Sequence, residues 1–395
     1  MNLIERSDKV LSRVLGHSTE LEISHGKGAY LYGLDGKAYL DFASGIAVTA
    51  TGHCHPEVVH AVTEQTKKII HNCAGVTYIS ANIELAEKLQ KIVPVKDARF
   101  FLTQSGSEAI EGALKAAKYV SGKSGVIALQ GGFHGRTMGA LSVTAKKLYR
   151  DGYGELMPNT YIVEPSIEAV AAANNGNIAA VIFELVKGEG GYEARDKEFV
   201  KKLREYCTQN NIYLVIDEVQ TGFGRTGKMF ACEWYGIEPD IMALAKGIAS
   251  GFPLGAAVMK KEISDSWKTS THGGTFTGNP VACAAGCVTV DILLREMPRM
   301  SAKIKTVEEA CDKLIAQYPQ IFIKRQGIGY MLGLVCVSGA VCAELRKRAL
   351  DNGLLVISSG AESEVVRLAY PITANIAELE KGFALIAKAA GEMPR

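Results

Sequence analysis

The sequence predicts an α/β protein whose larger part is built on a mostly parallel sheet. The first observation behind this prediction is an alternation of short apolar runs with amphipathic, helix-like segments along the 395 residues. Such runs between helical patterns are typical of strands that are buried on both faces of a helix-covered sheet. The clearest helices are 110–120 and 196–210, and the predicted strands are 98–102, 126–129, 179–183, 212–216, 241–244 and 255–259.

The second observation is that the pattern begins again after Pro298. A smaller α/β domain is expected there, and the first residues should join it, because 29–32 and 38–41 suit a hairpin around Asp35-Gly36. We therefore expect a large domain of residues 53–297 and a small domain made of 1–52 and 298–395. The elements predicted after Pro298 are a helix to 318, a strand at 330–337, a helix at 342–351, strands at 354–357 and 365–368, and a helix at 376–390.

The composition excludes several classes of protein. The chain is 47% hydrophobic and 22% charged, with a net charge of +2, which is ordinary for a soluble globular protein. Its paired lysines are dispersed, so a nucleic-acid partner is not expected. The first residues mix acids and bases at helical spacing, and no apolar run is long enough for a membrane span. Neither a signal peptide nor a membrane segment is expected.

The cysteines and histidines suggest neither disulfides nor a metal. Nine cysteines without a CxxC pair favour reduced thiols and a cytoplasmic location. His53-Cys54-His55 contains metal-binding residue types, but no second cluster accompanies it. Because a structural zinc site takes four ligands, we expect no metal.

A glycine motif raises the alternative of a dinucleotide site. Residues 222–227 spell GxGxxG after an apolar run. A Rossmann fingerprint needs its first glycine directly after the strand, and a second strand that ends in an acid. Here 217–221 separate the strand from the glycines, and Asp217 and Glu218 would repel a pyrophosphate. An NAD-dependent oxidoreductase is therefore disfavoured.

Polar and glycine residues follow several of the predicted strands instead. After one strand, Gly106 allows close approach to the backbone, and Ser107 opens a helix whose free N–H groups favour a phosphate. Segment 132–137 adds an aromatic ring and a guanidinium. Asp217 ends one apolar run, and Lys246 follows another, where a lysine is costly unless paired or used. Each feature alone also fits an ordinary turn or helix start.

Together these features indicate pyridoxal phosphate (PLP) chemistry. A lysine amine can form a Schiff base with an aldehyde, and a helix N-terminus can hold a phosphate. A carboxylate can keep the proton on a pyridine nitrogen, so that the cationic ring withdraws electrons from the substrate Cα.

Over nearly its whole length the sequence resembles the class III (subgroup II) aminotransferases, which have PLP fold type I. SGSEAIEGALKAAKY is similar to their phosphate-binding segment, FHGRT to the ring-stacking and carboxylate segment, and GEGG to the segment of the switch glutamate. IDEVQTGFGRTGKMFACEWYGIEPDIMALAKG resembles the family signature. The GFGRTG stretch belongs to this signature.

The resemblance implies a role for each matching residue. Lys246 would be the Schiff-base lysine, which also moves a proton between substrate Cα and cofactor C4′. Asp217 would pair with the pyridinium nitrogen. The other implied cofactor contacts are Gln220 to the ring hydroxyl, Phe133 and Val219 on the two ring faces, Gly106 and Ser107 at the phosphate, and Thr275 at the phosphate of the neighbouring subunit in a homodimer.

The resemblance also implies two arginines that bind substrate carboxylates. Arg136 would bind the carboxylate far from the reacting amine, and Arg367 the α-carboxylate of glutamate or 2-oxoglutarate, because a guanidinium grips a carboxylate through two parallel bonds. Glu189 would neutralise Arg367 while a donor without an α-carboxylate is bound. Relatives often have Pro and Gln where this chain has Leu185 and Lys187.

The resemblance favours 4-aminobutyrate as the donor and 2-oxoglutarate as the acceptor. Segments 70–73, 124–128 and 274–276 are similar to that branch, and Ile46 would narrow the pocket for a short donor. Thr277 stands where glycine is common. N-acetylornithine or ornithine as the donor is the alternative, with a PLP aminomutase and a non-catalytic PLP-binding protein as further ones.

Overall fold

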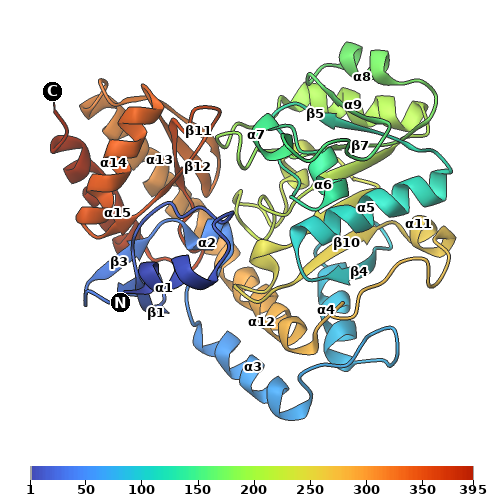
Figure 1. The fold of residues 1–395 in the computed structure, drawn as a ribbon, viewed down its shortest axis with the longest axis horizontal. Coiled ribbons are helices and arrows are strands. Elements are labelled where there is room, and N and C mark those ends of the chain that lie inside the picture. The colour runs from blue at the N-terminus through green and yellow to red at the C-terminus, as the bar shows by residue number, and fades with distance from the viewer. Residues whose placement is uncertain (1, 395) are drawn as a thin grey trace.

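The central feature of the computed structural model, which describes residues 2–394, is a sheet of seven strands (Figure 1). Its strand order is β4-β10-β9-β8-β7-β5-β6. The neighbouring strands β9, β8, β7, β5 and β6 run parallel to one another. Strand β10 is antiparallel to both of its neighbours, β4 and β9. The prediction of an α/β fold with a mostly parallel sheet is confirmed. The strands are β4 (Arg99–Thr103), β5 (Gly125–Leu129), β6 (Thr160–Val163), β7 (Ile178–Phe183), β8 (Tyr213–Asp217), β9 (Ile241–Leu244) and β10 (Gly255–Met259).

Both faces of this sheet are covered by helices, which explains the continuous apolar runs. Every residue of β5 and β7 is buried. Successive side chains of a strand point to opposite faces, and they join different apolar clusters here. Val126 and Ala128 pack with α5 (Gly106–Ser121). Ile127 and Leu129 pack with α8 (Ile167–Ala173) and α9 (Lys197–Gln209).

Two smaller sheets complete the fold. The first has the order β1-β2-β3-β13 and joins the two ends of the chain, because β13 is parallel to β3. The second has the order β11-β12-β15-β14. Figure 1 shows the first strands, in blue, beside the C-terminal helices, in red. The elements are β1 (Ile23–Lys27), β2 (Tyr30–Gly33), β3 (Ala38–Asp41), β11 (Phe322–Ile328), β12 (Met331–Cys336), β13 (Leu354–Leu355), β14 (Ile357–Ser359), β15 (Val365–Leu368), α13 (Met300–Gln317), α14 (Gly339–Asp351) and α15 (Ile376–Gly391).

The predicted strand 354–357 was wrong in one respect, because this stretch divides between β13 and β14, which belong to different sheets. Three strands were missed: β1, β6 and β11. None of them is fully buried: β1 and β11 contain polar residues such as the exposed Lys324, and the apolar run of β6 is only three residues long. The predicted hairpin is present as β2 and β3.

The remaining helices cover the edges of the large sheet and the surface. Helices α3 and α4 both pack against α12. No helix among residues 2–394 is both long enough and apolar enough to cross a membrane. These helices are α1 (Leu3–Val10), α2 (Ser44–Ala47), α3 (Pro56–Lys68), α4 (Ser80–Gln90), α6 (Met138–Ser142), α7 (Lys147–Arg150), α10 (Cys232–Tyr235), α11 (Lys261–Ser266) and α12 (Pro280–Glu296), with 3₁₀ turns at Lys246–Ile248 and Met297–Arg299.

Candidate active site

A cavity of about 310 Å³ lies at the carboxyl ends of the central strands. Ligands of open α/β sheets bind at this edge, because the loops that follow parallel strands meet there. The segments that line the cavity follow β4, β5, β7, β8 and β9. The structure brings eight of the residues singled out in the sequence together in its wall: Gly106, Ser107, Phe133, Glu189, Asp217, Val219, Gln220 and Lys246.

Lys246 lies directly beyond the end of β9, in the wall of this cavity. Its backbone has a φ of +44°, in the left-handed region that a non-glycine residue adopts only at a cost of about 1–2 kcal/mol. Burial lowers the pKa of the Lys246 amine, and the charge of Arg367 lowers it further. A lysine with a depressed pKa is a better nucleophile near neutral pH. The site therefore contains an amine prepared to attack a carbonyl carbon.

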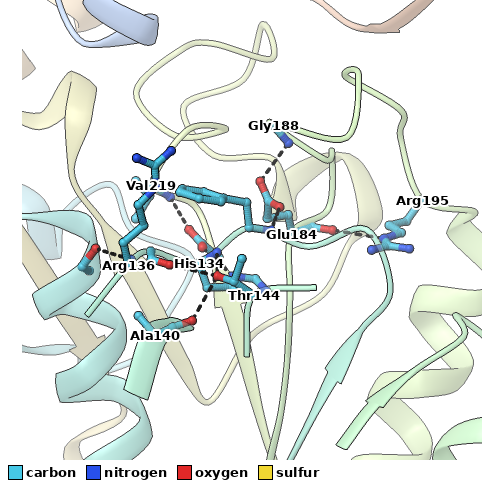
Figure 2. A network of polar contacts seen from close by, with 12 residues as sticks. His134, Arg136, Ala140, Thr144, Glu184, Gly188, Arg195 and Val219 are labelled. Atoms are coloured by element: carbon cyan, nitrogen blue, oxygen red, sulfur yellow. Dashed lines mark hydrogen bonds and ion pairs between the residues drawn. The ribbon is translucent and has the colours of Figure 1, made fainter. Parts of the chain in front are cut away.

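Asp217 is the last residue of β8 and is held in place from two sides. Its Oδ1 accepts a hydrogen bond from the Val219 amide at 2.9 Å, and its Oδ2 lies 2.7 Å from Nδ1 of His134. The amide of His134 in turn donates to Oγ1 of Thr144 at 3.0 Å, as Figure 2 shows. The side chains of Asp217 and His134 are both buried. The histidine was not singled out in the sequence, although it belongs to the quoted FHGRT motif.

Glu184 is a second carboxylate beside the cavity, and it was also missed (Figure 2). Its Oε1 accepts from the Phe133 amide at 2.9 Å, and its Oε2 accepts from the Gly188 amide at 2.8 Å. Burial, together with the charge of Asp217, raises the pKa of Glu184 to about 6. This carboxyl group ties the loop of the aromatic ring to the loop of Glu189.

Substitution of Glu184 by Gln is expected to change the pH dependence of stability. The pKa of Glu184 is raised from 4.5 to about 6, so the folded state binds more protons than the unfolded state between these values. Wild-type stability should therefore fall by about 2 kcal/mol as the pH rises through this window. In E184Q this pH-dependent contribution should disappear. The glutamine should also lower the free energy of unfolding by about 1–3 kcal/mol near pH 7, because its NH₂ group would face a backbone N–H donor.

Urea unfolding of wild type and E184Q from pH 4 to 7 measures this difference. The matched control is Glu198→Gln, because Glu198 is exposed on α9. Stability profiles that stay parallel for wild type and E184Q would show that Glu184 does not titrate in this way.

The start of α5 forms a cradle that suits an anion. Ser105 caps the helix by accepting from the Glu108 amide at 3.2 Å, while Gly106 and Ser107 form the open first turn. A Cβ at position 106 would lie 2.8 Å from Cγ1 of Val219, so only glycine allows this approach. Helix N-termini favour phosphate because their free N–H groups and the helix dipole point at it.

Several buried polar atoms of the cavity wall have no partner among the described residues. They are Nε2 of Gln104, Nε2 of His134 and Oε1 of Gln220. Buried polar groups are nearly always hydrogen-bonded in native proteins. Their free hydrogen-bonding capacity therefore points to a polar ligand in this cavity.

Arg367 and Glu189 form an ion pair, with Nη1 of the arginine 2.7 Å from Oε1 of the glutamate. Arg367 lies on β15 and is only 4% exposed, and its Nε has no hydrogen-bond partner among residues 2–394. The backbone carbonyl of Glu189 accepts from the Gly360 amide at 3.1 Å. A buried guanidinium needs a negative partner, and here that partner, Glu189, lines the cavity.

Four other residues expected at the site do not line the cavity in this chain, and Arg367, the partner of Glu189, is one of them. Arg136 is exposed at the rim, with its guanidinium carbon 4.5 Å from the ring centroid of Tyr149 and 5.8 Å from that of Phe133. Thr275 and Ile46 are exposed as well. From the segment of Ile46, it is Val48 that lines the cavity.

The segment around Ile46 has an uncommon backbone, which the sequence did not reveal. Four consecutive residues, from Ser44 to Ala47, have φ between +47° and +66°. Oδ1 of the buried Asp41 accepts from the amides of Ala43 and Ser44 and so supports the start of this left-handed turn. Oδ2 of Asp41 lies 2.7 Å from Nε2 of His53, so this histidine of the His-Cys-His stretch has a structural partner.

Fold and site together define an aminotransferase that uses PLP. The match to the family of class-III aminotransferases extends over residues 13–390. The chain is 37% identical to the acetylornithine aminotransferase of Archaeoglobus fulgidus over 96% of this chain and 98% of that protein. It is also 37% identical to the 5-aminovalerate aminotransferase DavT of Pseudomonas putida, over 99% of this chain and 98% of the relative. The chain belongs to the class-III aminotransferase family.

Solved structures agree with this assignment. A transaminase from the marine bacterium Virgibacillus superposes with a TM-score of 0.93 at 25% identity, over 99% of this chain and 98% of that one. The ornithine aminotransferase of Toxoplasma gondii superposes with a TM-score of 0.92 at 25% identity, over 98% of this chain and 94% of the other. None of the relatives named here is described as acting on 4-aminobutyrate.

The residues of the cavity fit PLP. The α5 cradle, where no Cβ fits at position 106, suits the phosphate, and the unpartnered Oε1 of Gln220 can accept a hydrogen bond from a ring hydroxyl. Asp217 supplies a buried carboxylate for the ring nitrogen, and Phe133 and Val219 supply the apolar surfaces that a planar ring needs. Lys246 supplies the amine.

Proposed function

We propose that this enzyme is an ω-aminotransferase that takes the terminal amino group of N-acetylornithine and passes it to 2-oxoglutarate. The observation that supports a donor of this kind is the ion pair of Arg367 with Glu189, which lines the cavity. A terminal amine has no carboxylate on the reacting carbon, so Arg367 needs another negative partner while such a donor reacts. The pair provides it.

The choice of N-acetylornithine over 4-aminobutyrate, the donor favoured in the sequence analysis, rests on the named relatives. Acetylornithine aminotransferases match this chain at 37% identity over 96% of its length and at 42% over 84%. The 5-aminovalerate relative supports a second candidate donor. All three donors combine a primary terminal amine with a distant carboxylate, for which we propose Arg136, at the cavity rim, as the partner.

We propose a role in the reaction for each of the main residues of the cavity. PLP, when bound, withdraws electrons from the substrate carbon that bears the amine. Lys246 would move a proton from this carbon to C4′ of the cofactor. Asp217, oriented by His134, would keep a proton on the ring nitrogen. Gln220 would bond the ring hydroxyl, and Gly106 and Ser107 would bind the phosphate.

The acceptor step would use the same pocket with Arg367 released. The α-carboxylate of 2-oxoglutarate would replace the carboxylate of Glu189 on the guanidinium, through two parallel charge-assisted bonds. One cavity could then accept two differently charged partners in turn, as a ping-pong reaction requires.

Absorption spectroscopy of the purified enzyme tests this function. N-acetylornithine, 5-aminovalerate, 4-aminobutyrate, ornithine and glutamate would each be added separately under single-turnover conditions. We expect N-acetylornithine to bleach the band of the bound cofactor fastest, and 2-oxoglutarate to restore it. A faster reaction with 5-aminovalerate or 4-aminobutyrate would replace the proposed donor. A band that none of these amines bleaches would overturn the proposed donor and favour another amine or a mutase.

We infer a homodimer in which Thr275 reaches the phosphate site of the partner. The support is exposed apolar surface on this loop: Phe276 is 59% exposed, and its ring lies 5.0 Å from that of His71. Large exposed apolar patches mark contact surfaces. Sedimentation of the 42.4 kDa chain should give a species of twice this mass; a monomer at micromolar concentration would contradict it.

We also infer a cytoplasmic location, which is supported by the state of the cysteines. All nine are free thiols, and seven of them are buried. Cell fractionation tests this inference, and recovery in an extracellular or periplasmic fraction would overturn it.

A further inference from the structure

A second cavity of about 680 Å³ adjoins the active-site cavity, and Phe133 and Glu189 line both. The wall of the second cavity contains four lysines: Lys146, Lys147, Lys187 and Lys324. Its acidic residues, besides Glu189, are Glu193 and Glu364. Glu189, whose carboxylate is paired with the buried Arg367, therefore also borders a cavity that contains four lysines.

The backbone of the Glu189 loop is held at several points. Its ends are tied together, because the Lys187 amide donates to the Glu193 carbonyl at 3.0 Å and Val186 bridges Ala194. The Gly360 amide donates to the carbonyl of Glu189 at 3.1 Å. A change of partner for the Glu189 carboxylate therefore requires rotation of its side chain rather than movement of the loop.

Among the four lysines, Lys187 is best placed to accept a carboxylate. Lys147 and Lys324 are exposed, and the amine of Lys146 lies 5.7 Å from the ring centroid of Tyr149. The side chain of Lys187 is only 16% exposed. A Cβ at Gly131 would lie 3.5 Å from its Nζ, which places the amine against the loop that leads to Phe133.

The present partner of Lys187 can be exchanged. The lysine forms an ion pair with Glu193, whose side chain is 59% exposed. Exposed carboxylates contribute little to such pairs, because water and salt screen them. A second carboxylate in this cavity can therefore share or take the ammonium group at small cost.

We propose that Lys187 is a positioning residue that receives the carboxylate of Glu189 when the α-carboxylate of 2-oxoglutarate binds Arg367. This inference rests on the proposed function and adds a residue to it. Lys187 favours the released position of Glu189, and so it assists the acceptor half-reaction but has no part in the donor half-reaction.

The test compares the two half-reactions of Lys187→Gln by stopped-flow absorption of the bound cofactor. The second-order rate constant for 2-oxoglutarate should fall about tenfold, the size expected for loss of one charge-assisted hydrogen bond. The rate constant for the best amine donor should stay within about twofold of wild type. Lys187→Arg keeps the charge and should restore the 2-oxoglutarate rate. Lys324→Gln, a lysine of the same cavity, should leave both rates unchanged.

A double variant separates this role from a structural one. In a Glu189→Gln background there is no charge to receive, so adding Lys187→Gln should have no further effect on the 2-oxoglutarate rate. The inference is overturned if K187Q slows both half-reactions equally, if neither rate changes, or if its effect persists in the E189Q background. Failure of the wild-type enzyme to show two half-reactions would refute the proposed function instead.

Discussion

Lys246→Ala should abolish transamination, with a loss of at least about 10⁴-fold in kcat, while the protein stays folded. The variant loses both the amine that attacks the cofactor aldehyde and the base at the substrate carbon. No other lysine lines the active-site cavity, within the described residues, to replace it. The measurement is multiple-turnover activity with the best donor and 2-oxoglutarate, together with the absorption spectrum, in which the Schiff-base band should be absent.

The matched control is Lys228→Ala. Lys228 belongs to the same signature but is exposed, and its amine lies 5.6 Å from the ring centroid of Trp234. This variant should keep near wild-type activity. Far-UV circular dichroism would show that both variants are folded. Repeated turnover by folded K246A would refute the mechanism.

Glu189→Ala should weaken terminal-amine donors by about 100-fold in the rate constant of the donor half-reaction. Removing one partner of a buried ion pair leaves an uncompensated charge, which costs about 3–5 kcal/mol in a closed interior and less beside a cavity. The half-reaction with 2-oxoglutarate should change only a few-fold, because its α-carboxylate itself neutralises Arg367. Stopped-flow measurement of each half-reaction with purified enzyme gives both numbers.

Glu198→Ala is the control for Glu189→Ala, since Glu198 is exposed and pairs with Lys202 at 3.7 Å on α9. Neither half-reaction should respond to it. Equal losses of donor and acceptor rates in the Glu189 variant would show that Glu189 holds the site together rather than switching between partners.

The central sheet could be predicted because its strands are buried on both faces. A strand such as β7, in which every residue is buried, must be apolar throughout, and this pattern is visible locally. The missed strands are not fully covered: β1 and β11 have polar, loop-like sequences, and the apolar run of β6 is too short to stand out. The limits of the two domains, at 53 and 298, stay a prediction.

Part of the site could be predicted for a related reason. Asp217, Lys246 and Gly106 each lie at or just beyond the end of a strand, so the strand pattern itself indicated that they share one edge of the sheet. Lys187 is a different case. The sequence shows only that it replaces a common glutamine, and its ion pair with Glu193 became visible in the structure.

The sequence alone determined the fold class, the cofactor and the family, because each depends on local patterns: buried strands and the residues that directly follow them. Only the tertiary structure decided which groups touch. His134 meets Asp217 across 83 residues, and Arg367 meets Glu189 across 178. Such contacts, and the pKa values that burial shifts, depend on distances between segments far apart in the chain, which no local pattern of residue types contains.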